Sequence, residues 1–255
     1  MKALKTRKNF LLVMLIIGGV IGLTALSGKS YNGSPRQEET IKSKDEKKFP
    51  IAVFSASLPA DSKERAQRLA RSGRFDKRAT VPFDETDPDT TMRGTVSEWY
   101  LYIAALPTAE SDVVVLGEVI SAKGYLSNDR TSAYSEFAIR VNEVFKSDSR
   151  PSGNSMTAVR EGADVQLPSG RIIRREIVYQ GMPRIGQQYM FFLKYNEQGN
   201  DYSILTGYEI RNGVVIPLDE ADHFAAYKKL DEETFLNAVR EALVNPPRAP
   251  RGNGG

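Results

Sequence analysis

The strongest constraint on the fold is a series of short segments, spread over residues 112–216, that have the two-residue periodicity of β-strands. In several of these segments apolar and polar side chains alternate, as they do in a strand that buries one face. Turn-forming residues separate them, at Ser127-Asn128-Asp129, Pro168-Ser169-Gly170 and Asn212-Gly213. About five to seven such strands, with short turns between them, predict a mainly β domain built as a small barrel or sandwich.

The sequences of individual strands predict more specific features of burial, irregularity and turn type. The segment from Asp112 to Ile120 is apolar on both faces, which predicts a strand buried on both sides or a barrel wall beneath a helix. The alternation that begins at Tyr134 slips at Glu143-Val144-Phe145, which predicts a β-bulge. Asn212-Gly213 between two apolar runs predicts a tight hairpin turn. The other expected strands lie at 155–160, 165–167, 171–179, 188–195, 202–210 and 214–216.

Helices are expected on both sides of the strands. The first covers residues 95–106, where a capping-box spacing precedes an apolar helical face and where a strand is the alternative. After the strands, residues 222–227 and 231–244 predict one or two helices, the second with Asp231 as its N-cap. The residues behind the first prediction are Thr95, Glu98, Trp99, Tyr102, Ile103 and Leu106.

The N-terminus carries a membrane-targeting signal. Four cationic residues in the first eight are followed by an uncharged run from Phe10 to Leu26, which is the pattern of an export leader. Residues 1–27 therefore predict a signal peptide, cleaved near Ala25-Leu26-Ser27, or a signal anchor that holds the membrane through residues 10–26. In both cases the rest of the chain is expected outside the cytoplasm, periplasmic or at the cell surface.

The remaining segments predict three regions. Residues 28–93 are rich in charge, Ser, Gly and Pro, which predicts a mostly disordered tether. A short helix at 61–75 is an option within it, because Asp61 and Glu64 have the spacing of a capping box. Residues 94–244 are expected to form the β domain with its flanking helices, and residues 245–255 a disordered tail.

The order of these segments resembles a known fold family. The apolar run that starts at Asp112, the strand from Tyr134 to Lys146, the turn from Gly181 to Gly186 and the hairpin at Asn212-Gly213 are similar to bacterial exported domains with a netrin-like OB fold. The resemblance covers about residues 95–218 and implies a small OB-like β-barrel of the kind found in tissue inhibitors of metalloproteinases. Those inhibitors place an N-terminal cysteine on the protease zinc. This chain has no cysteine, so neither inhibition nor any functional residue carries over.

The composition argues against several classes of function. The formal net charge is +3, but four positive charges lie in residues 1–9, which contain no acidic residue. Residues 10–255 therefore carry a net charge of −1, which argues against a nucleic-acid partner, since that needs a cationic face. The absence of cysteine rules out disulfides, thiolate metal sites, a cysteine nucleophile and a lipidated cysteine.

The candidate contact residues for a ligand or partner are Arg171, Arg174, Arg175 and Tyr179. Guanidinium groups bind anions well, so an anionic headgroup or acidic polysaccharide is one interpretation, and solvated charges on a strand edge are the other. His223 is the only histidine, which limits histidine-based catalysis and excludes a metal site with two histidines. The sequence therefore predicts no catalytic residue, no metal and no cofactor.

Two functions remain. The first is a non-catalytic binding or assembly module of the cell envelope, whose partner is an unknown envelope protein or anionic polymer. The alternative is a hydrolase that acts on envelope polymers through paired carboxylates. A close pair of partly buried acids in one cleft would favour the hydrolase, and a surface lined by tyrosine and arginine would favour the binding module.

Overall fold

The computed structural model describes residues 49–77, 80–86, 91–97, 99–147 and 154–249. The predicted leader, the first part of the predicted tether and the end of the predicted tail lie outside these residues. Among the helices of the described part, none combines the length and the apolar character needed to cross a membrane.

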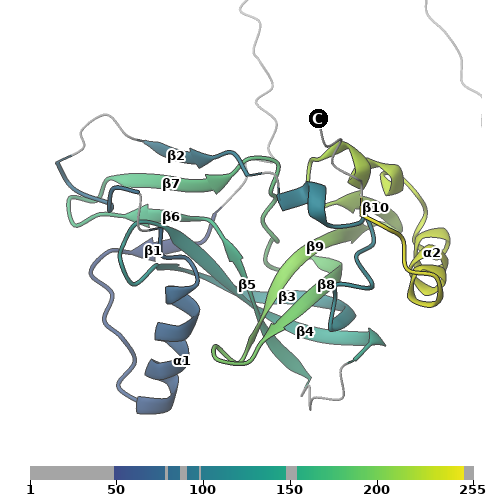
Figure 1. The fold of residues 1–255 in the computed structure, drawn as a ribbon, viewed down its shortest axis with the longest axis horizontal. Coiled ribbons are helices and arrows are strands. Elements are labelled where there is room, and N and C mark those ends of the chain that lie inside the picture. The colour runs from purple at the N-terminus through teal and green to yellow at the C-terminus, as the bar shows by residue number, and fades with distance from the viewer. Residues whose placement is uncertain (1–48, 78–79, 87–90, 98, 148–153, 250–255) are drawn as a thin grey trace, which may run out of the picture. The chain divides into compact units, whose positions relative to one another are not determined.

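The described part of the chain is mainly β, as the sequence predicts, and its strands form two sheets (Figure 1). The smaller sheet has the order β1-β6-β7-β2, and the larger has the order β10-β9-β5-β4-β3-β8. The strands are β1 (Ile51–Val53), β2 (Met92–Thr95), β3 (Val113–Leu126), β4 (Ala133–Lys146), β5 (Ser155–Glu161), β6 (Ala163–Gln166), β7 (Ile172–Ile177), β8 (Gln188–Asn196), β9 (Asp201–Arg211) and β10 (Val214–Pro217).

Five strands of the larger sheet are linked by pairings that return to the starting strand. β3 pairs antiparallel with β4, β4 with β5, and β8 with both β3 and β9. β5 and β9 run parallel and complete the ring of pairings, with Ala158 opposite Tyr202 and Val159 opposite Ser203. One apolar cluster draws side chains from all five strands, so these strands share a core.

The strand β3 is buried on both of its faces, as predicted. Val113, Val115 and Val119 belong to the cluster shared by the five strands. Val114 points to the other side, into a second cluster that contains Phe235 of the helix α2 (Glu232–Val244). Alternate residues of one strand therefore serve two cores, which explains the unbroken run of apolar residues.

The bulge and the hairpin are confirmed. Val114 pairs with Lys146 and Val115 with Val144, so Phe145 is the additional residue of the bulge on β4. The turn between β9 and β10 has positive φ at both central residues, 53° at Asn212 and 73° at Gly213. These values are those of a type I′ turn, which matches the twist of the two strands.

The C-terminal helix is also confirmed, with its predicted cap. The side chain of Asp231 accepts a hydrogen bond from the main-chain nitrogen of Thr234 at 2.9 Å, which satisfies one free donor of the first turn of α2. Residues Asp222–Tyr227 form the 3-10 segment η2 rather than an α-helix.

The segment 95–106 differs from the predicted helix. Thr95 ends the strand β2, and its main-chain oxygen accepts a hydrogen bond from Val178 at 3.0 Å. Only Trp99–Tyr102 is helical, as the short 3-10 segment η1. Trp99 and Tyr100 pack against the second core, whereas Tyr102 is 72% exposed, so tertiary contacts outweigh the helical spacing.

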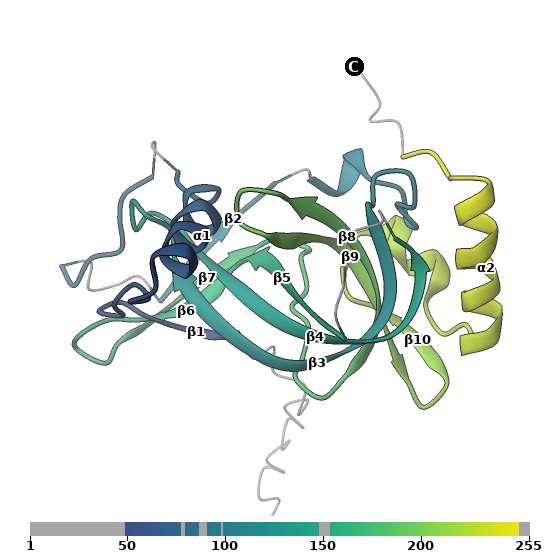
Figure 2. The ribbon, with the colours of Figure 1, turned by 90° about the horizontal axis from the view of Figure 1, so that it is seen from below.

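The structure also differs from a mostly disordered tether over 28–93. From Phe49 onward this stretch supplies β1, the helix α1 (Ser62–Gly73) and the first half of β2. β1 and β2 form the two edges of the smaller sheet. α1 lies within the optional helix at 61–75, and Asp61 caps it by accepting from Glu64 at 2.8 Å. In Figures 1 and 2, α1 and α2 lie at opposite ends of the described strands.

Candidate functional site

Arg175, one of the predicted contact residues, is a buried residue that joins strands. Its side chain donates to Glu161 at 2.8 Å and to the hydroxyl of Ser132 at 3.2 Å. A further bond reaches the hydroxyl of Thr95, at the end of β2. With only 4% of Arg175 exposed, its charge is neutralised inside the protein rather than offered to a ligand.

The other predicted contact residues do not join Arg175 in one cationic surface. Arg174 makes a bidentate ion pair with Asp164, with distances of 2.8 and 3.1 Å. Arg174 directly precedes Arg175 in β7, so the two side chains point to opposite faces of the sheet. Arg171 donates to a main-chain oxygen in the loop before β2, and Tyr179 is exposed. Contact of these four residues with a ligand stays a prediction.

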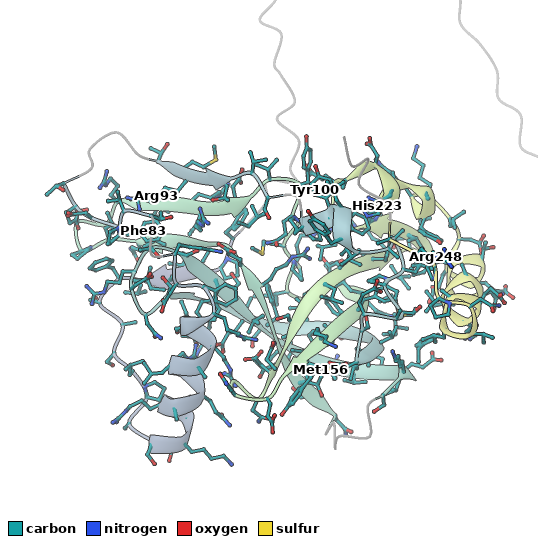
Figure 3. The ribbon with its side chains drawn as sticks, in the orientation of Figure 1. Phe83, Arg93, Tyr100, Met156, His223 and Arg248 are labelled. Carbon is teal, nitrogen blue, oxygen red and sulfur yellow. The ribbon has the colours of Figure 1, made fainter. Side chains whose placement is uncertain are left out.

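His223 lies against aromatic rings. Its ring centre is 3.9 Å from that of Phe224 and 6.4 Å from that of Tyr100, and Figure 3 labels His223 and Tyr100, which come from η2 and η1. Burial lowers the pKa of His223, so the neutral imidazole is favoured at neutral pH. Among the described residues, no group of three or more His, Asp or Glu side chains is placed to hold a metal ion.

A buried ion pair that the sequence does not reveal lies between Arg160 and Asp219. The two distances from the guanidinium to the carboxylate are 2.6 and 2.8 Å, and the side chains are 2% and 0% exposed. Asp219 also accepts from the hydroxyl of Thr206 at 2.7 Å and from the main-chain nitrogen of Gly181 at 2.9 Å. Because four hydrogen bonds from three donor groups saturate this carboxylate, the pair holds elements together.

A second set of buried charges docks α1 on the strands, and we call it the α1 network. Arg71 is its centre, 3.2 Å from Glu136 and 3.0 Å from Asp201. Arg68 pairs with Glu136 at 2.9 Å, and Arg74 pairs with Asp201 at 2.7 Å. Asp201 is fully inaccessible. The buried residues of α1 are Arg68, Arg71 and Ser72, so this helix is held by polar contacts more than by apolar ones.

Burial shifts the pKa of two side chains in this network. It raises the pKa of Glu136, while the ion pairs with Arg68 and Arg71 act in the opposite direction. It also raises the pKa of Tyr134, whose hydroxyl lies 3.2 Å from Glu136 and 3.0 Å from the hydroxyl of Ser72. Shifts of this kind occur at catalytic sites. Here both oxygens of Glu136 are engaged by neighbours on the same chain, as expected of a structural carboxylate.

Beside this network lies a cleft of about 830 Å³, which we call the α1 cleft. Its walls are the loop that leads from β1 to α1, one side of α1, and the end of β3 with the turn that follows. The volume suits a ligand of small-molecule size. The lining residues are Val53, Phe54, Ala56, Ser57, Leu58, Pro59, Ala60, Asp61, Glu64, Arg68, Leu69, Ser72, Gly124, Tyr125, Leu126, Ser127, Asn128 and Arg130.

The cleft combines accessible apolar side chains with cations. Val53, Leu58 and Leu69 are 47%, 48% and 40% exposed, although each is large and apolar. The guanidinium of Arg130 lies 4.5 Å from the ring centre of Phe54, and within the described part of the chain it has no hydrogen bond or ion pair. Such a mixed surface is typical of a binding site, since apolar groups left in water gain from being covered.

Arg68 forms part of the floor of the cleft. Its guanidinium carbon is 3.4 Å from the ring centre of Tyr125, in a cation–π contact. Its Nε atom is buried and has no hydrogen-bond partner among the described residues. A donor left unsatisfied in this way is rare in folded proteins and costs stability.

The sequence did not reveal the α1 cleft. Residues 54–72 contain too few large apolar residues to predict a packed element. One signal was available, because Arg68, Arg71 and Arg74 recur at intervals of three and therefore share one side of a helix. Their carboxylate partners lie far away in sequence, so the pairing needed the three-dimensional structure.

Two comparisons with known proteins assign no family to this chain. No protein-family model matches this chain, and a search of curated proteins gives no significant match.

Proposed function

We propose that this chain is a non-catalytic binding module and that the α1 cleft is its ligand site. The observation that carries the proposal is the cleft itself. It leaves large apolar side chains and the guanidinium of Arg130 accessible at the same place. A pocket of this volume with a few polar groups is the usual form of a small-ligand site.

The scaffold that we propose is an OB-like barrel. Its support is the ring of pairings β3-β4-β5-β9-β8, closed by the parallel contact of β5 with β9, and the cluster shared by these strands. The resemblance to netrin-like domains of exported bacterial proteins is part of this proposal. In this scaffold β1, α1 and β2 are additions, and β1 and α1 build the cleft against one end of the barrel.

The alternative, a hydrolase with paired carboxylates, has less support. Glu136 and Asp201 are the closely placed buried acids, and both contact Arg71. Asp201 is inaccessible to a substrate, and Glu136 is engaged by two arginines. The acids that line the cleft, Asp61 and Glu64, are exposed, and Asp61 caps α1. Neither pair therefore combines a buried, tuned acid with access to a substrate.

The proposed setting is outside the cytoplasm, because of the leader predicted for residues 1–27. There the ligand would be a component of the cell envelope, carried by an envelope protein or an anionic polymer. We propose no nucleic-acid partner and no cofactor, because the charge balance beyond the leader is slightly negative and the cleft needs no cofactor to bind.

The test blocks the cleft and compares binding with turnover. Ser57 is exposed and lines the cleft, so Ser57→Trp fills it without disturbing the core. Ser55 is exposed on the same loop but does not line the cleft, so Ser55→Trp is the matched control. The wild type and both variants are screened by thermal shift against amino acids, peptides, sugars and fatty acids, because a ligand that binds the folded state raises the melting temperature.

We expect at least one ligand class to raise the melting temperature of the wild type and of Ser55→Trp but not of Ser57→Trp. Hydrolysis of envelope polymers is measured on the same samples. If hydrolysis occurs and Glu136→Gln abolishes it while Ser57→Trp leaves all binding unchanged, the chain is an enzyme and the proposal is wrong.

A further inference from the structure

The α1 network carries an excess of positive charge next to the α1 cleft. Three guanidinium groups, from Arg68, Arg71 and Arg74, share the two carboxylates of Glu136 and Asp201. Within these five side chains one positive charge is therefore uncompensated. In a region screened from water, an uncompensated charge favours a nearby anion.

The cleft also contains a second cation, Arg130, at a position that a ligand can reach. Arg68 belongs to both the network and the floor of the cleft, but its Nε is buried, so it acts through its field rather than by direct contact. Arg130 is exposed, lines the same cleft, and has no polar partner for its guanidinium in the described part of the chain. Arg130 can thus donate directly to a carboxylate, with Asn128 beside it on the same turn.

The opposite end of the cleft carries acids. Asp61 and Glu64 lie at the start of α1, whereas Arg68 and Ser72 lie about one to three turns further along. At a rise of about 1.5 Å per residue, Asp61 is about 10 Å from Arg68 and about 16 Å from Ser72 along the helix axis. Leu58, Pro59 and Leu69 line the same cleft, and both leucines are exposed. Along α1 the cleft is therefore lined by acids at one end and by cations at the other, with exposed apolar side chains on the same surface.

We infer that the α1 cleft binds a short apolar peptide with free termini, and this inference rests on the proposed binding function. The C-terminal carboxylate lies at the end formed by Arg130 above Arg68, and the N-terminal ammonium lies at the end formed by Asp61 and Glu64. An extended chain spans about 3.3–3.6 Å per residue, so about three to five residues fill the distance between the two ends.

The experiment measures binding of tetrapeptide mixtures to the full-length chain by isothermal titration calorimetry. The mixtures contain Ala, Val and Leu at all four positions and are used in four forms: free at both ends, amidated at the C-terminus, acetylated at the N-terminus, and blocked at both ends. We expect the free form to bind most tightly and each block to weaken binding about tenfold, because each removes one charge-assisted contact.

Two variants assign the ends. Arg130→Gln should remove the difference between the free-acid and the amidated mixtures, and Glu64→Gln should remove the difference between the free-amine and the acetylated mixtures. Both side chains are exposed, so neither change disturbs the core. The matched controls are Lys63→Gln, on α1 outside the cleft, and Glu233→Gln, in the first turn of α2. Both should bind all four forms as the wild type does.

The outcomes separate this inference from the function on which it rests. Equal binding of all four forms, or no binding of the free mixture at about 1 mM, overturns the peptide assignment. If another ligand class still distinguishes Ser57→Trp from Ser55→Trp, the binding function stands and only the peptide is wrong. If no ligand distinguishes those two variants, the proposed function itself fails.

Discussion

Gly124 in β3 lies where the N-terminal segment passes very close to this strand. A Cβ atom at this position would lie 2.5 Å from the main-chain nitrogen of Ala52 and 2.8 Å from the main-chain oxygen of Pro50. These are backbone atoms, so no side-chain rotation can relieve the overlap. The crossing of β1 over β3 therefore depends on a glycine here, and this crossing forms one wall of the α1 cleft.

We predict that Gly124→Ala lowers the free energy of unfolding by about 2 kcal/mol or more, because β1 must move away from β3. Gly94 in β2 is the matched control, since a Cβ there meets nothing within 4 Å. Gly94→Ala should change the free energy by less than about 1 kcal/mol. Urea unfolding of both variants measures this difference, and equal midpoints would contradict the close crossing.

Asp129 organises the turn between β3 and β4. Burial acts to raise the pKa of its carboxyl group, but hydrogen bonds from Thr131, Ser127 and the main chain of Lys77 outweigh burial and lower the pKa to about 2. The folded state therefore holds the proton more weakly than the unfolded state, whose value is 3.8. The stability that Asp129 contributes is present above about pH 4 and is lost as the pH falls toward 2.

Asp129→Asn should therefore destabilise the protein most at neutral pH, and the difference from the wild type should shrink between about pH 4 and pH 2. The measurement is urea unfolding of the wild type and the variant at a series of pH values. The exposed Asp84 serves as a control for general acid effects, with Asp84→Asn expected to cost less at every pH. A difference that stays constant down to pH 2 would show that the hydrogen bonds of Asp129 do not shift its pKa.

At the scale of elements, the hairpin β9–β10 tests how local sequence specifies a turn. Gly213 has a φ of 73°, and a Cβ there meets nothing within 4 Å, so any cost of substitution is conformational. We predict that Gly213→Val lowers the free energy of unfolding by about 1 kcal/mol or more, because a β-branched residue fits a positive φ badly. Gly213→Asn should recover much of the loss, and an unchanged melting temperature in the valine variant would remove the turn assignment.

Elements whose sequence signals are local were predictable from this chain, and elements held by distant partners were not. The Asn212-Gly213 turn, the Asp231 cap and the bulge at Phe145 depend on neighbouring residues or on the period of one strand. The helix expected over 95–106 begins at Thr95, yet Thr95 belongs to β2, which pairs with β7, about 80 residues away. Helical spacing of aromatic residues cannot outweigh such pairing, and sequence alone does not contain it.

Prediction of the candidate site from the sequence has the same limit. The arginines of β7 were the visible cationic cluster, but Arg174 and Arg175 are engaged by Asp164 and Glu161. In the α1 cleft the accessible cation is Arg130, which stands alone in sequence and lines the same cleft as Arg68 only because α1 docks beside the β3–β4 turn. Clusters along a strand are split between its two faces, whereas sites form where separate elements meet.

At the scale of the whole molecule, the segment that begins at Phe49 is part of the folded unit. Its helix places three arginines on the buried carboxylates of Glu136 and Asp201, and Ala52 and Phe83 contribute to the core of the smaller sheet. The strands β4 and β9 therefore present two buried acids whose cationic partners, among the described residues, all come from this segment. Without it, those acids would be left in a poorly hydrated position with no cationic partner.

This dependence gives a prediction for two truncated chains. A chain of residues 49–249 keeps all described elements and should unfold at the same urea concentration as the full-length protein. A chain of residues 95–249 loses β1, α1 and most of β2, and should be less stable by about 3–5 kcal/mol or fail to fold, since breaking a buried ion pair from one side costs that much. Replacing Glu136 by Gln and Asp201 by Asn in the shorter chain should recover part of the loss, because neutral amides tolerate the position better than unpaired carboxylates. If the two truncated chains unfold at the same midpoint, the N-terminal segment is an accessory, and the α1 cleft is not supported by the fold.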